Sequence, residues 1–83
     1  MQSQKQTVSG IISDENGLPL PGASVLEAGT RNGMVTDFDG KYQLTVESNT
    51  AIIVVSFVGN KEKRVVANQK NINIQLLPDA TDL

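Results

Sequence analysis

Asp14-Glu15-Asn16-Gly17-Leu18-Pro19-Leu20-Pro21-Gly22-Ala23 is the stretch that decides the fold, and Asp37-Phe38-Asp39-Gly40 repeats its opening chemistry further along the chain. Asn-Gly and Asp-Gly pairs between alternating apolar runs are strong hairpin signals, because Gly and Asn tolerate the positive φ of tight turns. The two prolines cannot donate to a central β-ladder, so they indicate an edge or a crossover. The stretch therefore predicts a small antiparallel β domain.

Segments of alternating polarity lie on both sides of these turns. Residues 41–47 alternate cleanly, with Tyr42, Leu44 and Val46 on one face. Residues 7–13 place Val8, Gly10 and Ile12 on one face and Ser9, Ile11 and Ser13 on the other. A strand is expected at 23–28, and Glu27 on its inward face indicates that it kinks or ends there. A short strand is expected at 34–36, and a further strand at 71–77 is expected to face inward through Ile72, Ile74 and Leu76.

Two further segments differ in character. Residues 51–58 are apolar on both faces, which predicts the most buried strand, covered on each side. Residues 61–67 carry mixed charges and predict an edge strand. The six or seven short strands, with turn signals about every 8–12 residues, are typical of an all-β sandwich or small barrel.

Composition narrows the class of protein. The chain has 83 residues, enough for one small domain, and it has no cysteine, so aliphatic side chains must form the core. Its net charge of −2 and the lack of a basic stripe argue against a nucleic-acid-binding protein. No apolar run approaches the ~20 residues of a membrane-spanning helix. Residues 2–6 are polar and form no signal peptide. The protein is therefore cytoplasmic, or Met1 stands where an export signal has been removed.

The sequence gives little support for a catalytic function. The chain contains neither histidine nor cysteine, which are the commonest general base and a common strong nucleophile. The carboxylate pairs Asp14/Glu15 and Asp37/Asp39 sit in predicted turns, without the cleft that a two-carboxylate hydrolase needs. We therefore expect no enzyme, no cofactor and no catalytic residue.

Calcium binding is the sharper alternative at residues 37–40. The segment resembles the start of a calcium loop but lacks its third acidic position and terminal Glu. The favoured interpretation is a turn that Asp37 caps and in which Gly40 supplies positive φ, so no metal ligand is assigned, although calcium at Asp37 and Asp39 stays open.

Four residues form the candidate interaction surface: Phe38, Lys61, Lys63 and Arg64. Phe38 lies in a turn between two aspartates, and we interpret it as a small hydrophobic plug in preference to an exposed contact. Glu62 interrupts the basic residues, which favours a solvated strand face. Residues 61–67 would nevertheless allow a second chain to pair with their edge by β-augmentation.

The order of the motifs resembles a known family. The matching segments keep a near-constant spacing over residues 7–78, at 8–10, 14–23, 29–30, 32–33, 35–37, 39–42 and 56–59. Together they resemble the carboxypeptidase-D regulatory-like domain, as found at the N-terminus of SusC-like TonB-dependent outer-membrane transporters. The resemblance implies a transthyretin-like, immunoglobulin-like (prealbumin-like) antiparallel β-sandwich of about seven strands.

The resemblance also implies an organisation and a function. Residues 1–6 would form a disordered tail, 7–78 the sandwich, and 79–83 a linker toward a TonB box. The domain would be a non-catalytic accessory module at the periplasmic face of the outer membrane, and it would dock or space parts of a transporter that imports nutrients, glycans in particular. Its partners would be the plug and barrel of that transporter, with periplasmic or inner-membrane TonB-system components, but not nucleic acid, and it would not insert into the membrane itself.

Two alternatives stay open. The domain could be an interaction or stalk module of another exported or surface protein. A small carbohydrate-binding module ranks lower, because only Phe38 and Tyr42 could offer an aromatic platform. The sequence leaves the transported nutrient, the partner and the oligomeric state undetermined.

Overall fold

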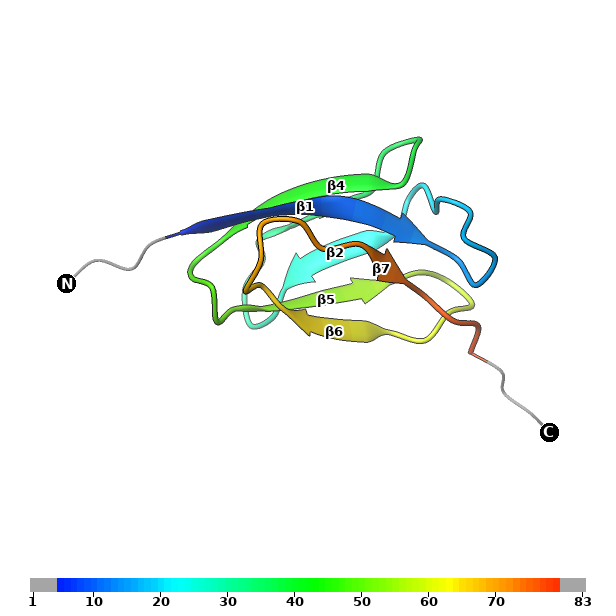
Figure 1. Cartoon of the computed structure of the whole chain (residues 1–83). Coiled ribbons are helices and arrows are strands. Elements are labelled where there is room, and N and C mark those ends of the chain that lie inside the picture. Colours follow the sequence, from blue (N-terminus) through cyan, green and yellow to red (C-terminus); the bar gives the residue numbers. More distant parts are fainter. Residues whose placement is uncertain (1–4, 80–83) are drawn as a thin grey trace.

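The computed structural model describes residues 5–79, which form strands and turns without a helix. The strands are β1 (Gln6–Ser13), β2 (Ser24–Glu27), β3 (Gly33–Val35), β4 (Lys41–Val46), β5 (Ile52–Ser56), β6 (Lys63–Val66) and β7 (Ile74–Gln75). They form a three-stranded sheet in the order β4-β1-β7 and a four-stranded sheet in the order β3-β2-β5-β6 (Figure 1). The predicted all-β sandwich is confirmed.

The three-stranded sheet is built around β1. β4 pairs with it in antiparallel register from Gln6↔Val46 to Ile11↔Lys41, and β7 pairs with it in parallel. This register places Val8 and Ile12 of β1 on the inner face with the apolar residues of β4, whereas Ile11 lies on the outer face at 39% exposure. Val8 and Ile12 are fully buried, while the outward residues of β4 are exposed.

The segment that leads into β7 meets β1 at Gly10 and Ile11, where side chains replace some of the backbone hydrogen bonds of a regular ladder. The Ile72 carbonyl lies over Gly10, so near that a Cβ there would come within 2.0 Å of its oxygen. That carbonyl accepts a hydrogen bond from the Tyr42 hydroxyl at 2.6 Å, and the Ile11 amide donates instead to Asn73 Oδ1 at 2.9 Å. Gly10 is therefore required by this close approach of two backbones.

The four-stranded sheet has β5 in its interior, between β2 and β6. Ile53 and Val55 are fully buried, but the alternate residues Ile52 and Val54 are only half-buried, and Val58 lies beyond the strand with 92% exposure. The prediction that residues 51–58 are covered on both sides is wrong. Only one face of β5 meets the opposite sheet, and the other face has only its neighbouring strands beside it.

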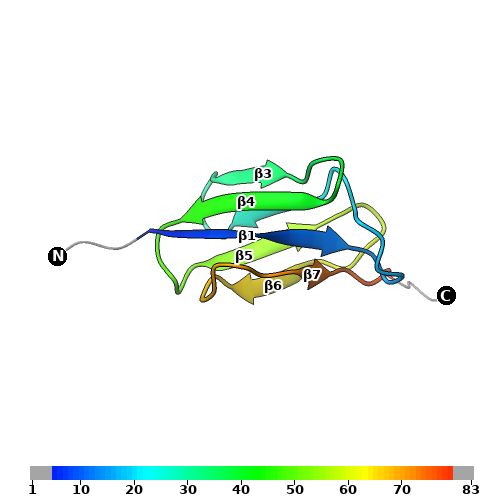
Figure 2. The ribbon, with the colours of Figure 1, turned by 45° about the horizontal axis from the view of Figure 1, so that its top comes forward.

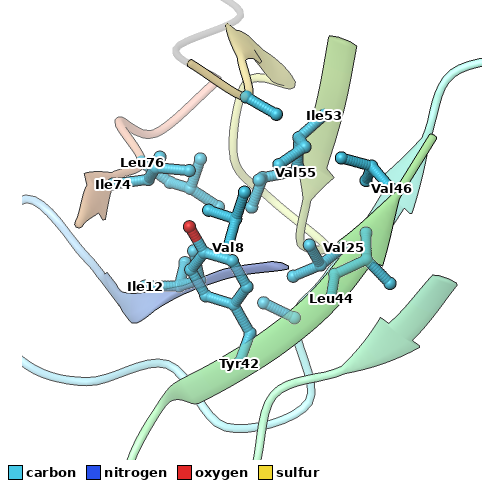
Figure 3. Close-up of a cluster of buried hydrophobic side chains, with 12 residues drawn as sticks. Val8, Ile12, Val25, Tyr42, Leu44, Val46, Ile53, Val55, Ile74 and Leu76 are labelled. Carbon is cyan, nitrogen blue, oxygen red and sulfur yellow. The ribbon is translucent and has the colours of Figure 1, made fainter. Parts of the chain in front are cut away.

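The core is aliphatic except for one aromatic ring. Figure 3 shows buried side chains of both sheets directed at one another, with Tyr42 among them. The twelve buried hydrophobic residues are Val8, Ile12, Ala23, Val25, Tyr42, Leu44, Val46, Ile53, Val55, Ala67, Ile74 and Leu76. Because both sheets supply these residues, neither sheet buries its apolar face alone.

The ends of the elements agree with the sequence to within a few residues. β1 begins at Gln6, inside the tail expected at 1–6, and β2 ends at Glu27, as its inward-facing carboxylate indicated. The remainder of that tail, and the linker expected at 79–83 beyond Asp79, lie outside the described residues. No helix of the described chain is long and apolar enough to cross a membrane.

Candidate functional site

The loop at residues 37–41 is a turn closed by its own aspartate. Asp37 Oδ1 accepts hydrogen bonds from the backbone amides of Asp39 and Lys41, both at 2.9 Å. The Gly40 amide donates to the Asp37 carbonyl, and Gly40 has a φ of 75°. The predicted capped turn is confirmed.

Residues 14–18 form the same turn a second time. Asp14 Oδ1 accepts the amides of Asn16 and Leu18 at 2.8 and 2.9 Å, and Gly17 has a φ of 82°. In both turns Oδ1 of the first aspartate is used by two backbone amides. Among residues 5–79, no three acidic side chains come together in a group that could hold a metal ion.

Phe38 lies at the tip of its turn and is 88% exposed. The interpretation of Phe38 as a plug is wrong, and the alternative of an exposed side chain holds. The Asp37 carboxylate closes the turn on the amides of residues 39 and 41, and Ile12, Pro19 and Leu20 crowd the turn at Gly40. The Phe38 side chain is left to solvent.

The predicted basic residues do not form one cluster. Lys63 is the cross-strand partner of Val55, and Arg64 that of Val54, so their side chains lie on opposite faces of β6. Arg64 forms an ion pair with Glu62 at 3.1 Å, and both side chains are at least half exposed. Lys61 precedes the strand, and its amide donates to the Leu77 carbonyl. Phe38 follows β3, at the opposite edge of the sheet.

The edge strands of the two sheets differ in how they are covered. Side chains from the β2–β3 hairpin occupy the outer edge of β4: Met34 Sδ accepts the Gln43 amide, Asn32 Nδ2 donates to the Thr45 carbonyl, and Glu27 Oε2 accepts the Glu47 amide. β6 is also the last strand of its sheet, and no strand lies beyond it among residues 5–79. The predicted edge strand is therefore confirmed, as one of the two end strands of the four-stranded sheet.

A hollow lies on the outer face of the three-stranded sheet. Its volume is about 570 Å³, and Ile11, Lys41, Gln43, Asn71 and Asn73 are among its lining residues. Tyr42 also lines it, but only 3% of this residue is exposed, and burial raises its pKa to about 12. Because its ring is packed in the core, Tyr42 cannot serve as the exposed platform that a sugar site needs.

The two ends of the sandwich have different surfaces, which sequence reasoning missed. We call the loops at 14–23, 36–40, 57–62 and 76–79 the exit end, and those at 28–32, 47–51 and 67–73 the opposite end. The described chain leaves from the exit end after residue 79 and enters at the opposite end (Figures 1 and 2). The exit end carries four exposed large hydrophobic residues: Leu18, Phe38, Val58 and Leu77.

The loops of the opposite end carry none of the exposed large hydrophobic residues of the described chain. They are rich in Asn, Thr, Ser and Gln. No single loop reveals this difference, because each contributes only one exposed large hydrophobic residue. Only the sheet topology, which brings four distant loops together, makes the pattern visible.

Comparison with known proteins gives one consistent result. The family model of the CarboxypepD_reg-like domain matches residues 8–83. The chain is 43% identical over 82 residues to the TonB-dependent receptor SusC of Bacteroides thetaiotaomicron, which covers 98% of this chain and 8% of that protein. It is 38% identical over 77 residues to the TonB-dependent receptor P39 of Formosa agariphila, covering 92% of this chain and 7% of that protein.

A further relative from the same organism extends the match. The TonB-dependent receptor P3 of Formosa agariphila is 34% identical over 85 residues, covering 100% of this chain and 8% of that protein. The chain thus spans less than a tenth of the length of each of these curated relatives.

Proposed function

The chain belongs to the CarboxypepD_reg-like domain family, and from this premise we propose that it is the N-terminal, non-catalytic accessory domain of a SusC-like TonB-dependent outer-membrane receptor. The receptor would import a nutrient, a glycan in particular, and the domain would lie at the periplasmic face of the membrane. The observation that carries the proposal is the match of 98% of this chain to a small part of the receptor SusC. The absence of histidine and cysteine from the sequence supports a role without catalysis.

The outer edge of β6, beyond which no strand lies among residues 5–79, supports a docking role for the domain. In an antiparallel ladder the backbone groups of alternate residues point away from the neighbouring strand. The Ala67 amide donates to Ala51, so the alternate residues Val65 and Lys63, paired with Ile53 and Val55, also bond to β5. Arg64, between Lys63 and Val65, therefore presents its N–H and C=O outward. An extended segment of a partner could pair with these groups by β-augmentation.

The docking role can be tested by closing this edge. Arg64→Pro removes an amide that faces outward, whereas the β5–β6 ladder keeps its own donors, and proline is tolerated on edge strands. Arg64→Ala removes the same side chain and retains the amide. We expect the proline variant of the parent receptor to lose partner binding and nutrient uptake, with the alanine variant close to the wild type. Equal behaviour of the two variants would exclude pairing through this edge.

The assignment to a receptor can be tested on the parent gene. Translation beyond residue 83 is expected to give a TonB box, a plug and the strands of a barrel, and any other continuation would reject the assignment. In-frame deletion of residues 7–78 is then expected to lower nutrient uptake while the receptor remains at normal abundance in the outer membrane. Replacement of the deleted residues by an unrelated domain of similar span separates the two roles, because it would restore uptake only if spacing alone matters.

A further inference from the structure

We propose that the exit end is a docking face for the part of the receptor that follows this domain in the same polypeptide. This inference rests on the proposed function, in which the remaining length of the receptor follows residue 83. It concerns a different surface from the β6 edge, and it starts from the apolar tips of the exit end. Single exposed hydrophobic residues are ordinary on protein surfaces, but their collection on one face is typical of an interaction site.

The apolar tips are held in place by the backbone. The two most exposed are Phe38 and Val58, at 88% and 92%. Phe38 sits in the turn that Asp37 closes, and Val58 precedes Gly59, whose φ is 86°, in a turn closed by a hydrogen bond from Asn60 to Phe57. The Leu18 amide donates a hydrogen bond to Asp14 Oδ1, and the Leu18 carbonyl accepts one from the Asp14 amide. Because these loops are already ordered, little conformational entropy is lost when a partner covers them.

The exit end also offers a recess beside one of these tips. A hollow of about 370 Å³ is lined by Gly22, Ser24, Ser56, Phe57 and Val58. Three of its lining residues are small, and the other two are the half-buried Phe57 and the exposed Val58. An apolar side chain of a partner would fit such a recess, while Val58 itself inserts into the partner.

Charge restricts the kind of partner. The loops of the exit end carry six acidic residues, Asp14, Glu15, Asp37, Asp39, Glu62 and Asp79, against Lys61, and the exposed Lys41 and Lys63 begin the strands beside them, so the acidic residues remain in excess. An acidic surface of this kind repels anionic lipid headgroups and favours a protein surface that presents basic residues around apolar ones. The composition of the face therefore favours a protein over a membrane.

The path of the chain identifies which protein surface is nearest. The Asp79 amide donates to the Gly59 carbonyl, next to Val58, so the described chain ends within the apolar face itself. Whatever follows residue 79 in a parent receptor begins at this face. A tethered partner has an effective concentration of the order of millimolar, so even modest contacts suffice for docking.

Site-specific photo-crosslinking in the full-length receptor, in its native outer membrane, tests this inference. A photoreactive phenylalanine analogue is placed at position 38 or 58, and at 49 or 69 of the opposite end as matched exposed controls. We expect positions 38 and 58 to crosslink within the same polypeptide, to peptides beyond residue 83, and the two controls to give no such product. Three results would overturn the inference: no crosslink, crosslinks only to a separate protein or to lipid, or equal crosslinking from both ends.

A charge variant makes the test quantitative. For this test the photoreactive residue is placed at position 18 of the exit end. Phe38→Asp combined with Val58→Asp should lower the yield of its intramolecular crosslink by about tenfold or more, because two apolar contacts are lost. Asn49→Asp combined with Gln69→Asp adds the same charge at the opposite end and should leave the yield unchanged. Unfolding of the 83-residue chain shows whether either variant disturbs the fold. A yield that both pairs lower equally would contradict docking through the exit end.

Uptake measurements keep this inference separate from the proposed function. If the crosslinks form but deletion of residues 7–78 leaves uptake unchanged, the docking face stands and the proposed accessory role in import fails. If the deletion lowers uptake but the crosslinks are absent, the accessory role stands and the docking face fails.

Discussion

Gly17 and Gly40 hold the same position in two copies of one turn, but their surroundings differ. Both have a φ near 80°, which costs a residue with a side chain about 1–2 kcal/mol. A Cβ at Gly17 would meet nothing within 4 Å, whereas one at Gly40 would lie 2.7 Å from the Ile12 carbonyl oxygen and 2.9 Å from Pro19 Cβ. The two positions therefore separate backbone strain from crowding.

We expect Gly17→Ala to lower the free energy of unfolding by about 1 kcal/mol and Gly40→Ala by about 3 kcal/mol, because only the second adds overpacking to strain. Urea denaturation of the two variants measures the difference. Equal losses would mean that Pro19 and the end of β1 move aside without cost.

The buried Tyr42 is expected to make the fold less stable at strongly alkaline pH. Burial raises the pKa of its phenol to about 12, so the folded state keeps a proton that the unfolded chain loses near pH 10. A folded pKa above the unfolded one means that this stabilisation is complete below pH 10 and is lost as pH rises through 12. The loss is about 3 kcal/mol in total.

The chain offers a direct measurement of this titration, because Tyr42 is its only tyrosine and tryptophan is absent. Phenolate absorbance should rise near pH 12 in the folded protein and near pH 10 in denaturant. Tyr42→Phe should cost about 1 kcal/mol through the lost hydrogen bond to Ile72, and it should remove the additional alkaline destabilisation. A folded tyrosine that titrates near pH 10 would contradict the assignment.

Some single residues could be predicted from sequence and others could not. The turn at residues 37–40 was predictable, because Asp37 and Gly40 act within four residues of each other. The orientation of Phe38 was not, since it depends on what lies beneath the turn. The role of Gly10 was not predictable either, because the carbonyl that passes over it belongs to Ile72.

At the scale of elements, Thr36 joins β3 to the proline-rich crossover that precedes β2. Its buried Oγ1 donates to the Leu20 carbonyl and accepts the Ala23 amide, and its own backbone bonds to Ala23 and Gly22. The hydroxyl thus supplies the polar partners that this irregular segment lacks. The prolines at 19 and 21 mark the crossover in the sequence, but Thr36 holds it in place.

Thr36→Val keeps the shape of the side chain and leaves two buried backbone groups unpaired. We expect a loss of about 3 kcal/mol and a decrease in Tm of roughly 15 °C. Thr36→Ser, which retains the hydroxyl, should cost about 1 kcal/mol or less. Thermal unfolding of the two variants measures the contrast, and a valine variant as stable as the serine variant would show that the hydroxyl is dispensable.

The strands were predicted correctly where the alternation of polar and apolar residues matches the alternation of exposed and buried residues. β4 shows this most clearly, since every second residue is buried and the others are exposed. β5 misled the prediction because an interior strand can carry apolar residues on both faces when only one face is covered. The inward Glu27 was predicted to end its strand, but its hydrogen bonds to Asn32 and Glu47 depend on loops that only the fold brings together.

At the scale of the whole molecule, the difference between the two ends has no signature in any segment of the sequence. It arises because β1, β5 and β7 end where β2, β4 and β6 begin. Family resemblance could predict the sandwich and its context, but it supplied no reason to group Leu18 with Val58. The three-dimensional arrangement of the loops was needed for that.

The parallel pairing of β1 with β7 has a mechanical consequence. The chain enters and leaves the sandwich at opposite ends, so tension between residues 5 and 79 pulls the two neighbouring strands in opposite directions along their axes (Figure 2). The hydrogen bonds that Ser9 and Ser13 make with residues 70, 72 and 76 are then sheared together instead of being opened one by one.

Single-molecule pulling through the two termini should therefore need a higher force than pulling between Thr50 and Asn68, which flank the β5–β6 hairpin at its open end and would unzip it. Equal forces would show that the strands yield in another order. A domain with this geometry, linked in series between two moving parts, would transmit tension from one to the other without opening.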